Sequence, residues 1–123
     1  MKIGEGAIIG GNSGIHQFVH IGKYAMIGGM SGVGLNIIPY GLYTGIRSNL
    51  KGLNLIGLKR KNIKSTKINK INSVFKKIFN NTSTIEKNIK TLSVSEKKII
   101  EIKEIITFIS ANLKRGICKY SND

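Results

Sequence analysis

Aliphatic residues recur every six positions through the first third of this chain, and no other feature limits its possible folds so strongly. The series has no gap and consists of Ile3, Ile9, Ile15, Ile21, Ile27 and Val33. Glycine follows the aliphatic residue in every hexad but one, where His16 takes its place. The alternative is ordinary strands and turns in a chain rich in Gly and Ile. Such strands and turns rarely repeat both the aliphatic residue and the glycine after it at the same six-residue spacing.

A six-residue period predicts a left-handed parallel β-helix. Each hexad supplies one short strand and one turn, three hexads close a triangular coil, and the aliphatic side chain points into the coil. Successive coils then stack at about 4.8 Å. Glycine is expected at the corners, where the backbone needs a positive φ. We therefore expect residues 1–39 to form about two coils, with further coils missing upstream of Met1.

Two changes of pattern divide the rest of the chain. Pro39 is predicted to end the repeat, because its nitrogen carries no hydrogen for the ladder between coils. Residues 40–60 form the predicted junction, and the stretch from Tyr40 to Gly57 is interpreted as a loop because it is rich in Gly and Asn. Residues 61–123 are predicted to form a small α-helical bundle, so the fold class is β + α.

Apolar residues spaced three and four apart predict the helices of the last segment. The first is expected from about Ser65 to Asn80. Capping boxes at Ser83–Glu86 and at Ser93–Glu96 predict the starts of two more. The last of these is expected to end near Gly116, which can supply a left-handed C-cap.

The net charge of +14 suggests nucleic-acid binding as one hypothesis. Composition weakens it, because Ile, Lys and Asn together supply 52 of the 123 residues and all three have A/T-rich codons. The aromatic residues are scattered among core-like positions and offer no stacking platform for single strands. We therefore predict that nucleic acid is not a partner, and that the basic surface lies in the second half of the chain.

Cysteine and histidine are too few for a disulfide framework or a standard zinc site. The chain has one Cys and two His. We expect no metal, no cofactor and an inert Cys118 in a reducing compartment. No apolar run approaches the roughly 20 residues of a membrane span, and no export signal is recognisable. These features predict a cytoplasmic protein.

Two segments resemble a known family. They are Ile9-Gly-Gly-Asn-Ser-Gly-Ile-His-Gln-Phe, with Ile27-Gly-Gly-Met-Ser-Gly-Val after it, and Asn54-Leu-Ile-Gly-Leu-Lys-Arg-Lys. With a helical tail behind hexapeptide coils, the chain resembles the acyl-(acyl-carrier-protein)–UDP-N-acetylglucosamine O-acyltransferases of lipid A synthesis. The resemblance covers about Ile3 to Gly116. It implies a homotrimer with active sites between neighbouring solenoids, an acidic acyl carrier protein as partner, UDP-N-acetylglucosamine as substrate, and no metal.

The resemblance also implies what is absent. The family's general base is a His in a coil upstream of every residue present here, and its oxyanion-hole groups lie upstream as well. This chain alone is therefore expected to be catalytically incomplete. A non-catalytic trimeric solenoid that keeps affinity for the nucleotide or the carrier protein is the alternative.

Several residues match family positions individually. His16 resembles a supporting active-site His, and Gln17 resembles a substrate-contacting Gln. Because His16 replaces a corner Gly, its ring is expected on the outside of the wall. A surface His without a role is the alternative. His20 matches no site position and is interpreted as solvated.

The second segment resembles a nucleotide site. Asn54 and Arg60 match nucleotide-binding residues, and Lys61 matches a position beside the diphosphate. An amide can contact the uracil edge and a guanidinium can hold phosphate oxygens. The family has an acidic residue where this chain has Ile56, which leaves the recognition of the ribose open. The alternative is a solvated helix start at residues 59–61.

The resemblance gives two further sites. Gly29 falls at the position of the acyl-chain ruler, and a glycine merely permitting a tight corner is the alternative. A face bearing Lys64, Lys67, Lys70, Lys76 and Lys77 is expected to attract an acidic carrier protein. Solvated lysines of a biased composition are the competing interpretation.

Overall fold

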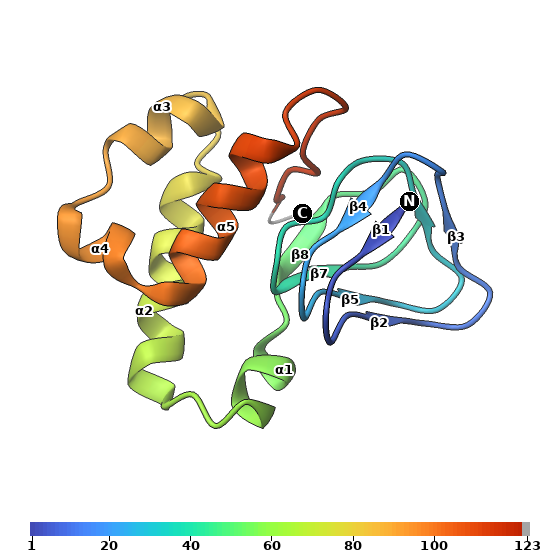
Figure 1. Ribbon diagram of the computed structural model, residues 1–123, viewed down its shortest axis with the longest axis horizontal. Coiled ribbons are helices and arrows are strands. Elements are labelled where there is room, and N and C mark those ends of the chain that lie inside the picture. Colours follow the sequence, from blue (N-terminus) through green and yellow to red (C-terminus); the bar gives the residue numbers. More distant parts are fainter. Residues whose placement is uncertain (122–123) are drawn as a thin grey trace.

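The structure is a computed structural model that describes residues 1–121 of the chain. Its strands are β1 (Lys2–Ile3), β2 (Ile8–Ile9), β3 (Gly14–Ile15), β4 (His20–Ile21), β5 (Met26–Ile27), β6 (Gly32–Val33), β7 (Gly41–Tyr43) and β8 (Leu50–Leu53). Its helices are α1 (Leu55–Arg60), α2 (Ser65–Ile78), α3 (Ile85–Lys90), α4 (Val94–Lys98) and α5 (Ile100–Ala111). The strands wind into a triangular coil, and α2 to α5 lie to one side of it (Figure 1).

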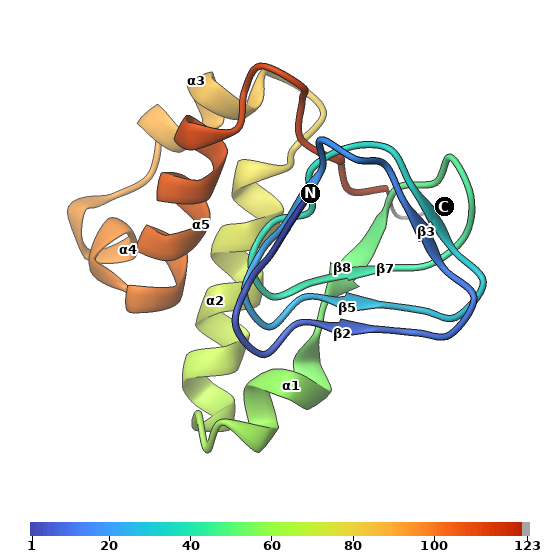
Figure 2. The same cartoon turned by 45° about the vertical axis from the view of Figure 1, so that its right-hand side comes forward.

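The register of the first six strands follows the hexad repeat. Lys2 pairs with His20, Ile8 with Met26, and Gly14 with Gly32, each in parallel orientation. Each pair is separated by eighteen residues, so three hexads complete one turn and each strand pairs with the strand one turn later. The predicted β-helix is confirmed by this pairing (Figure 2).

Residues beyond Pro39 add a third layer, so the prediction that Pro39 ends the repeat is wrong. Strand β7 pairs in parallel with β5, and isolated bridges join Ile21 to Ile37 and Gly32 to Ile46. Pro39 lies in the turn before β7, where the ladder needs no N–H donor. Strand β8 then runs antiparallel to β7. The predicted loop from Tyr40 to Gly57 is therefore largely ordered secondary structure.

The glycine that follows the aliphatic residue in five of the six hexads, here called the glycine column, has a different physical cause from the one predicted. Positive φ angles fall two positions later, at Gly6, Asn12, Tyr24 and Met30, and the column glycines do not have them. Instead, a Cβ on Gly4 would stand 2.5 Å from the Lys23 nitrogen, and one on Gly10 would stand 2.4 Å from the Gly29 nitrogen. Glycine is needed because adjacent coils approach too closely for a side chain.

The core runs from the coil interior into the helices. Ile21 and Ile27 are fully buried, whereas Ile3 in the first coil is 48% exposed. Within residues 1–121 the first coil stacks on one neighbour only, which leaves its interior residue partly uncovered. The buried side chains of α2 and α5 belong to the same continuous cluster. Burial of the apolar faces of these helices therefore fixes them against the solenoid.

The helix boundaries agree in part with the sequence. Helix α2 and the capping box of Ser93 and Glu96 are confirmed. The single helix predicted to run from that box is wrong, because the extended backbone of Ile99 divides it into α4 and α5. The box at Ser83 is wrong, because Thr84 caps α3 by accepting from the Lys87 N–H. Helix α5 ends at Ala111 rather than near Gly116, although Gly116 does adopt a φ of +110°.

The segment after α5 returns to the solenoid. Ile117 bridges to Asn36, and Tyr120 bridges to Leu50. The end of the described chain is thus part of the β layer rather than of the helical region. No helix within residues 1–121 combines the length and the hydrophobicity that a membrane span requires.

Candidate functional site

Asn54 fixes the start of α1 against the wall of the solenoid. Its Oδ1 accepts from the Gly57 N–H at 3.1 Å, which makes it the N-cap of α1, and its Nδ2 donates to the Tyr24 carbonyl at 3.0 Å. Its backbone N–H donates to the Tyr40 carbonyl at 2.7 Å. Asn is among the preferred N-cap residues because its side chain satisfies an unpaired helix N–H. The 6% exposed side chain therefore positions the helix that follows.

A cavity of about 350 Å³ lies beside this helix. We call it the α1 cavity; its lining residues are Gly6, Ile8, Tyr24, Met26, Asn54, Ile56, Gly57, Arg60 and Lys61. Residues from the coil form one wall and residues from α1 form the other. The structure thus brings together Asn54, Arg60 and Lys61, the three predicted nucleotide-binding residues. Ile56, 63% exposed, lines the same cavity.

The lining of the α1 cavity includes two cations, Arg60 and Lys61, and no acidic residue. Arg60 and Lys61 end the helix rather than start it, so the alternative of a solvated helix start is wrong in its placement. Cations in the last turn interact favourably with the partial negative charge of the helix C-terminus. A guanidinium also presents paired N–H donors that match phosphate or carboxylate oxygens. The cavity is therefore suited to an anionic ligand.

His16 and Gln17 lie elsewhere on the solenoid. His16 directly follows β3, and both side chains are exposed, as predicted for the His16 ring. His16 lines a separate cavity of about 710 Å³ together with Arg47, Ser48 and Cys118. Figure 2 shows β3 on a different face of the coil from the strands beside α1. Within one chain, the structure does not bring His16 or Gln17 into the α1 cavity.

The interpretation of His20 as a solvated residue is wrong. Its ring lies 4.7 Å from the Phe108 ring, and its Nδ1 is 3.3 Å from Asn112 Oδ1. His20 packs between the coil and the end of α5, where it contributes to the contact between the β-helix and the helices.

Gly29 is exposed and is not required by the backbone. Its φ lies outside the left-handed region, and a Cβ there would stand 3.5 Å from the Gly11 carbonyl oxygen, an ordinary contact. The alternative of a tight corner that only glycine permits is therefore not supported. The acyl-chain ruler stays a prediction.

The basic face of α2 is divided between paired and unpaired lysines. Lys77 binds Glu96 at 2.6 Å, and Lys67 lies 3.3 Å from Glu101. Lys64, Lys70 and Lys76 are exposed and have no ion pair within residues 1–121. Three of the five predicted lysines thus keep their charge available to a partner.

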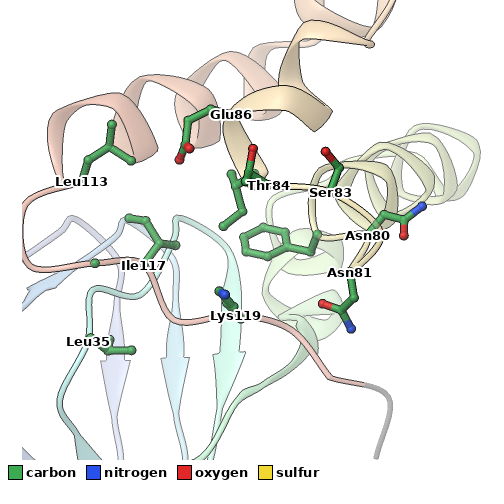
Figure 3. Close-up of a pocket in the computed structure, with 12 residues that line it drawn as sticks. Leu35, Asn80, Asn81, Ser83, Thr84, Glu86, Leu113, Ile117 and Lys119 are labelled. Atoms are coloured by element: carbon green, nitrogen blue, oxygen red, sulfur yellow. The ribbon is translucent and has the colours of Figure 1, made fainter.

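A further cavity, of about 460 Å³, lies where the returning segment passes the α2–α3 connection (Figure 3). Leu35, Leu113 and Ile117 supply apolar side chains, and Asn80 and Thr84 lie on the opposite side. None of the predicted site residues lines it. We assign it to the packing between the helices and the solenoid.

Sequence reasoning missed Tyr24, which forms part of the wall of the α1 cavity. The signal available in the sequence was its position, because residue 24 falls in the same hexad column as Gly6, Asn12 and Met30 and shares their positive φ. That position holds corners of the coil, and the Tyr24 ring lies over Gly6 of the preceding coil, where a Cβ on Gly6 would stand 2.3 Å from the ring.

Comparison of the sequence with known proteins gives one family. A profile of the UDP N-acetylglucosamine O-acyltransferases, domain 2, matches residues 36–118. An acyl-(acyl-carrier-protein)–UDP-N-acetylglucosamine O-acyltransferase of Agrobacterium fabrum is 39% identical over 118 residues, which cover 95% of this chain and 44% of that protein. The protein of the same name from Nautilia profundicola is 36% identical over 123 residues and is covered to 44%.

Solved structures give the same result. The UDP-N-acetylglucosamine acyltransferase from Campylobacter jejuni superposes with a TM-score of 0.86 at 31% identity, covering 97% of this chain and 46% of that one. The Arabidopsis UDP-N-acetylglucosamine acyltransferase gives a TM-score of 0.87 at 30% identity, covering 95% and 44%. The chain therefore spans less than half the length of these relatives.

Proposed function

Because this chain belongs to the UDP-N-acetylglucosamine O-acyltransferase family, we propose that it is the nucleotide-binding and carrier-docking part of such an enzyme. The reaction moves a 3-hydroxyacyl chain from acyl carrier protein to the 3-hydroxyl of UDP-N-acetylglucosamine and begins lipid A synthesis. We place it in the cytoplasm, since one cysteine in 123 residues offers no disulfide framework of the kind typical of oxidising compartments.

The α1 cavity carries this proposal. Arg60 holds the diphosphate through its paired N–H donors, and Lys61 adds a second positive charge beside it. One N–H and one oxygen lone pair of the Asn54 amide already form hydrogen bonds within the fold. The amide therefore contacts the base only through its second N–H and its second lone pair. Because Ile56 stands in place of an acidic residue, no carboxylate at this position accepts hydrogen bonds from the ribose hydroxyls.

The separation of His16 from the α1 cavity supports a homotrimer. We propose that three left-handed β-helices lie side by side and that His16 and Gln17 of one subunit face the nucleotide held by its neighbour. Gly29 leaves room for a long acyl chain in the same cleft. In this arrangement His16 supports the substrate, whereas deprotonating the sugar hydroxyl falls to a general base outside the matched residues.

The unpaired lysines of α2 support docking of an acidic carrier protein. Lys64, Lys70 and Lys76 supply a positive field that raises the rate of encounter and weakens with salt. A trimeric solenoid that binds these ligands without performing the chemistry is the second candidate, favoured by the absence of a general base among the matched residues.

Calorimetric titration with UDP tests the nucleotide site. We expect binding to weaken about tenfold or more in Arg60→Ala, because a charge-assisted phosphate contact is lost. Lys59→Ala is the matched control, since Lys59 is also exposed on α1 but does not line the cavity. Equal losses in both variants, or no binding of UDP by the wild type, would contradict the assignment.

An esterification assay separates the two candidates. The purified 123-residue chain is expected to form no product from 3-hydroxyacyl carrier protein and UDP-N-acetylglucosamine. If this chain alone formed product, the prediction that it is catalytically incomplete would be wrong. UDP binding without turnover, and with no gain when the remaining coils of a relative are supplied in trans, would favour the non-catalytic candidate.

A further inference from the structure

Two tyrosine rings form a stacked pair under the α1 cavity. The centroids of Tyr24 and Tyr40 are 5.9 Å apart, and the ring planes differ by 5°. Tyr40 is 1% exposed, whereas Tyr24 is half-buried and forms part of the cavity wall. Tyr40 is therefore a fixed base, and Tyr24 is the ring that reaches the ligand-accessible side.

Tyr40 is held by α5 through its hydroxyl. Its hydroxyl donates to Glu104 Oε1 at 2.5 Å, and Lys23 donates to Glu104 Oε2 at 2.5 Å. Burial, together with the hydrogen bond to Glu104, raises the pKa of Tyr40 well above its ordinary range. Burial disfavours the Glu104 carboxylate, but the hydrogen bonds from Lys23 and Tyr40 outweigh it and lower the pKa of Glu104. Near pH 7 the phenol is neutral and the carboxylate is charged, so the contact persists.

Lys61 lies against this pair. Its Nζ is 4.3 Å from the Tyr24 centroid, 5.3 Å from the Tyr40 centroid and 3.4 Å from the Tyr40 hydroxyl oxygen. An ammonium in this range is attracted by the negative face of an aromatic ring. The long lysine side chain otherwise has many rotamers to lose on binding a ligand. The contact selects one region for the ammonium before any ligand arrives.

Neither neighbouring cation shares this arrangement. Lys59 and Arg60 make no ring contact and no ion pair within residues 1–121. The tyrosine pair is thus a specific support for Lys61 at the wall of a cavity that has no acidic residue. The Lys61 ammonium donates one N–H to the Tyr40 hydroxyl and keeps its other two N–H donors for an anion.

We propose that Tyr24, seated on Tyr40, is a positioning residue that holds the Lys61 ammonium toward the phosphates of a nucleoside diphosphate in the α1 cavity. This inference rests on the proposed function. Tyr24 acts through Lys61, so its effect falls on the phosphates and not on the nucleoside.

Affinities for UDP and for uridine, measured by titration of the full chain, test this role. Tyr24→Leu is expected to weaken UDP about threefold to fivefold, the range of an exposed cation–π contact, and to leave uridine unchanged. Tyr24→Phe keeps the ring and restores UDP binding. Lys61→Met is expected to weaken UDP binding at least as much, because the phosphate contact itself is lost. Adding Tyr24→Leu to Lys61→Met gives no further loss, because Tyr24 acts only through Lys61.

A second measurement needs no ligand. The ε-methylene protons of Lys61, assigned with Lys61→Arg, are expected to be shifted upfield by the Tyr24 ring current and to lose that shift in Tyr24→Leu. If the wild type shows no such shift, the Lys61 side chain does not lie against the Tyr24 ring and the inference is wrong. It is also wrong if UDP binds and Tyr24→Leu weakens UDP and uridine equally. If the wild type does not bind UDP, the proposed function is wrong, and the inference fails with it.

Discussion

Gly22 lies directly against Pro39 of the next coil, so that a Cβ on Gly22 would stand 2.3 Å from the Pro39 nitrogen and 2.7 Å from its Cα. The Gly22 N–H donates to the Ile37 carbonyl at 2.8 Å, which holds the two coils at this separation. Backbone atoms on both sides prevent either coil from yielding. The repeat therefore keeps glycine where coils touch.

We expect Gly22→Ala to destabilise the protein by about 3 kcal/mol or more, because the added methyl forces the coils apart. Gly34→Ala is the matched control, since Gly34 stands in the same hexad column but a Cβ there would meet nothing within 4 Å. That variant is expected to stay within about 1 kcal/mol of the wild type. Urea unfolding measures both, and similar midpoints for the two variants would contradict the explanation.

Asn54→Ala is expected to cost about 1 to 2 kcal/mol of stability and to weaken UDP binding, because α1 loses its N-cap and its tie to the Tyr24 carbonyl. Asn49→Ala provides the comparison, since Asn49 is exposed and makes no side-chain hydrogen bond within residues 1–121. Thermal denaturation and UDP titration report the two effects. An Asn54→Ala protein with unchanged stability would show that the amide does not hold the helix.

We expect Glu96 to cause part of the loss of folding stability at acid pH. The hydrogen bond from Lys77, followed by that from the Ser93 N–H, lowers the pKa of Glu96 from 4.5 to about 2. A carboxylate with a lowered pKa contributes stability that is present above its unfolded value and is lost as pH falls through the folded one. The contribution is thus expected at pH 5 and above, and it disappears between about pH 4.5 and pH 2.

The variant Glu96→Gln is expected to lose less stability than the wild type between pH 5 and pH 3, since it has no proton to take up there. Glu86→Gln is the control, because Glu86 is exposed and has no ion pair within residues 1–121. Urea midpoints at the two pH values give the comparison. Parallel curves for Glu96→Gln and the wild type would rule out this source of pH dependence.

Cys118 is expected to resist alkylation in the folded protein. Burial raises the pKa of its thiol to about 11, so little thiolate exists at pH 8, and the side chain is 2% exposed. Iodoacetamide labelling in buffer and in denaturing urea measures the difference. A native rate equal to the unfolded rate would contradict this prediction.

How much of the site could be predicted depends on whether its residues are neighbours in sequence. Asn54, Arg60 and Lys61 share one short segment, and a single N-cap sets their relative positions. Tyr24 and Glu104 are far from that segment, and no local pattern links them to Lys61. The stacking of coils brings Tyr24 there, and the packing of α5 brings Glu104 to Tyr40.

The extent of the β layer shows the same limit. The strict hexad count ends before Pro39, yet Tyr43 and Ile46 beyond it still pair with the coil before them. The template already formed by the second coil, rather than a residue period, directs this third layer. For the same reason, the return of Ile117 to Asn36 has no sequence signature.

The β-helix, the main amphipathic helix and the family could all be predicted from the sequence, because each depends on a local period or a short motif. The packed structure was needed to explain the glycine column, the seating of the helices on the coils, and the rings that support Lys61. Those features depend on distances between segments that meet only after the coils have stacked.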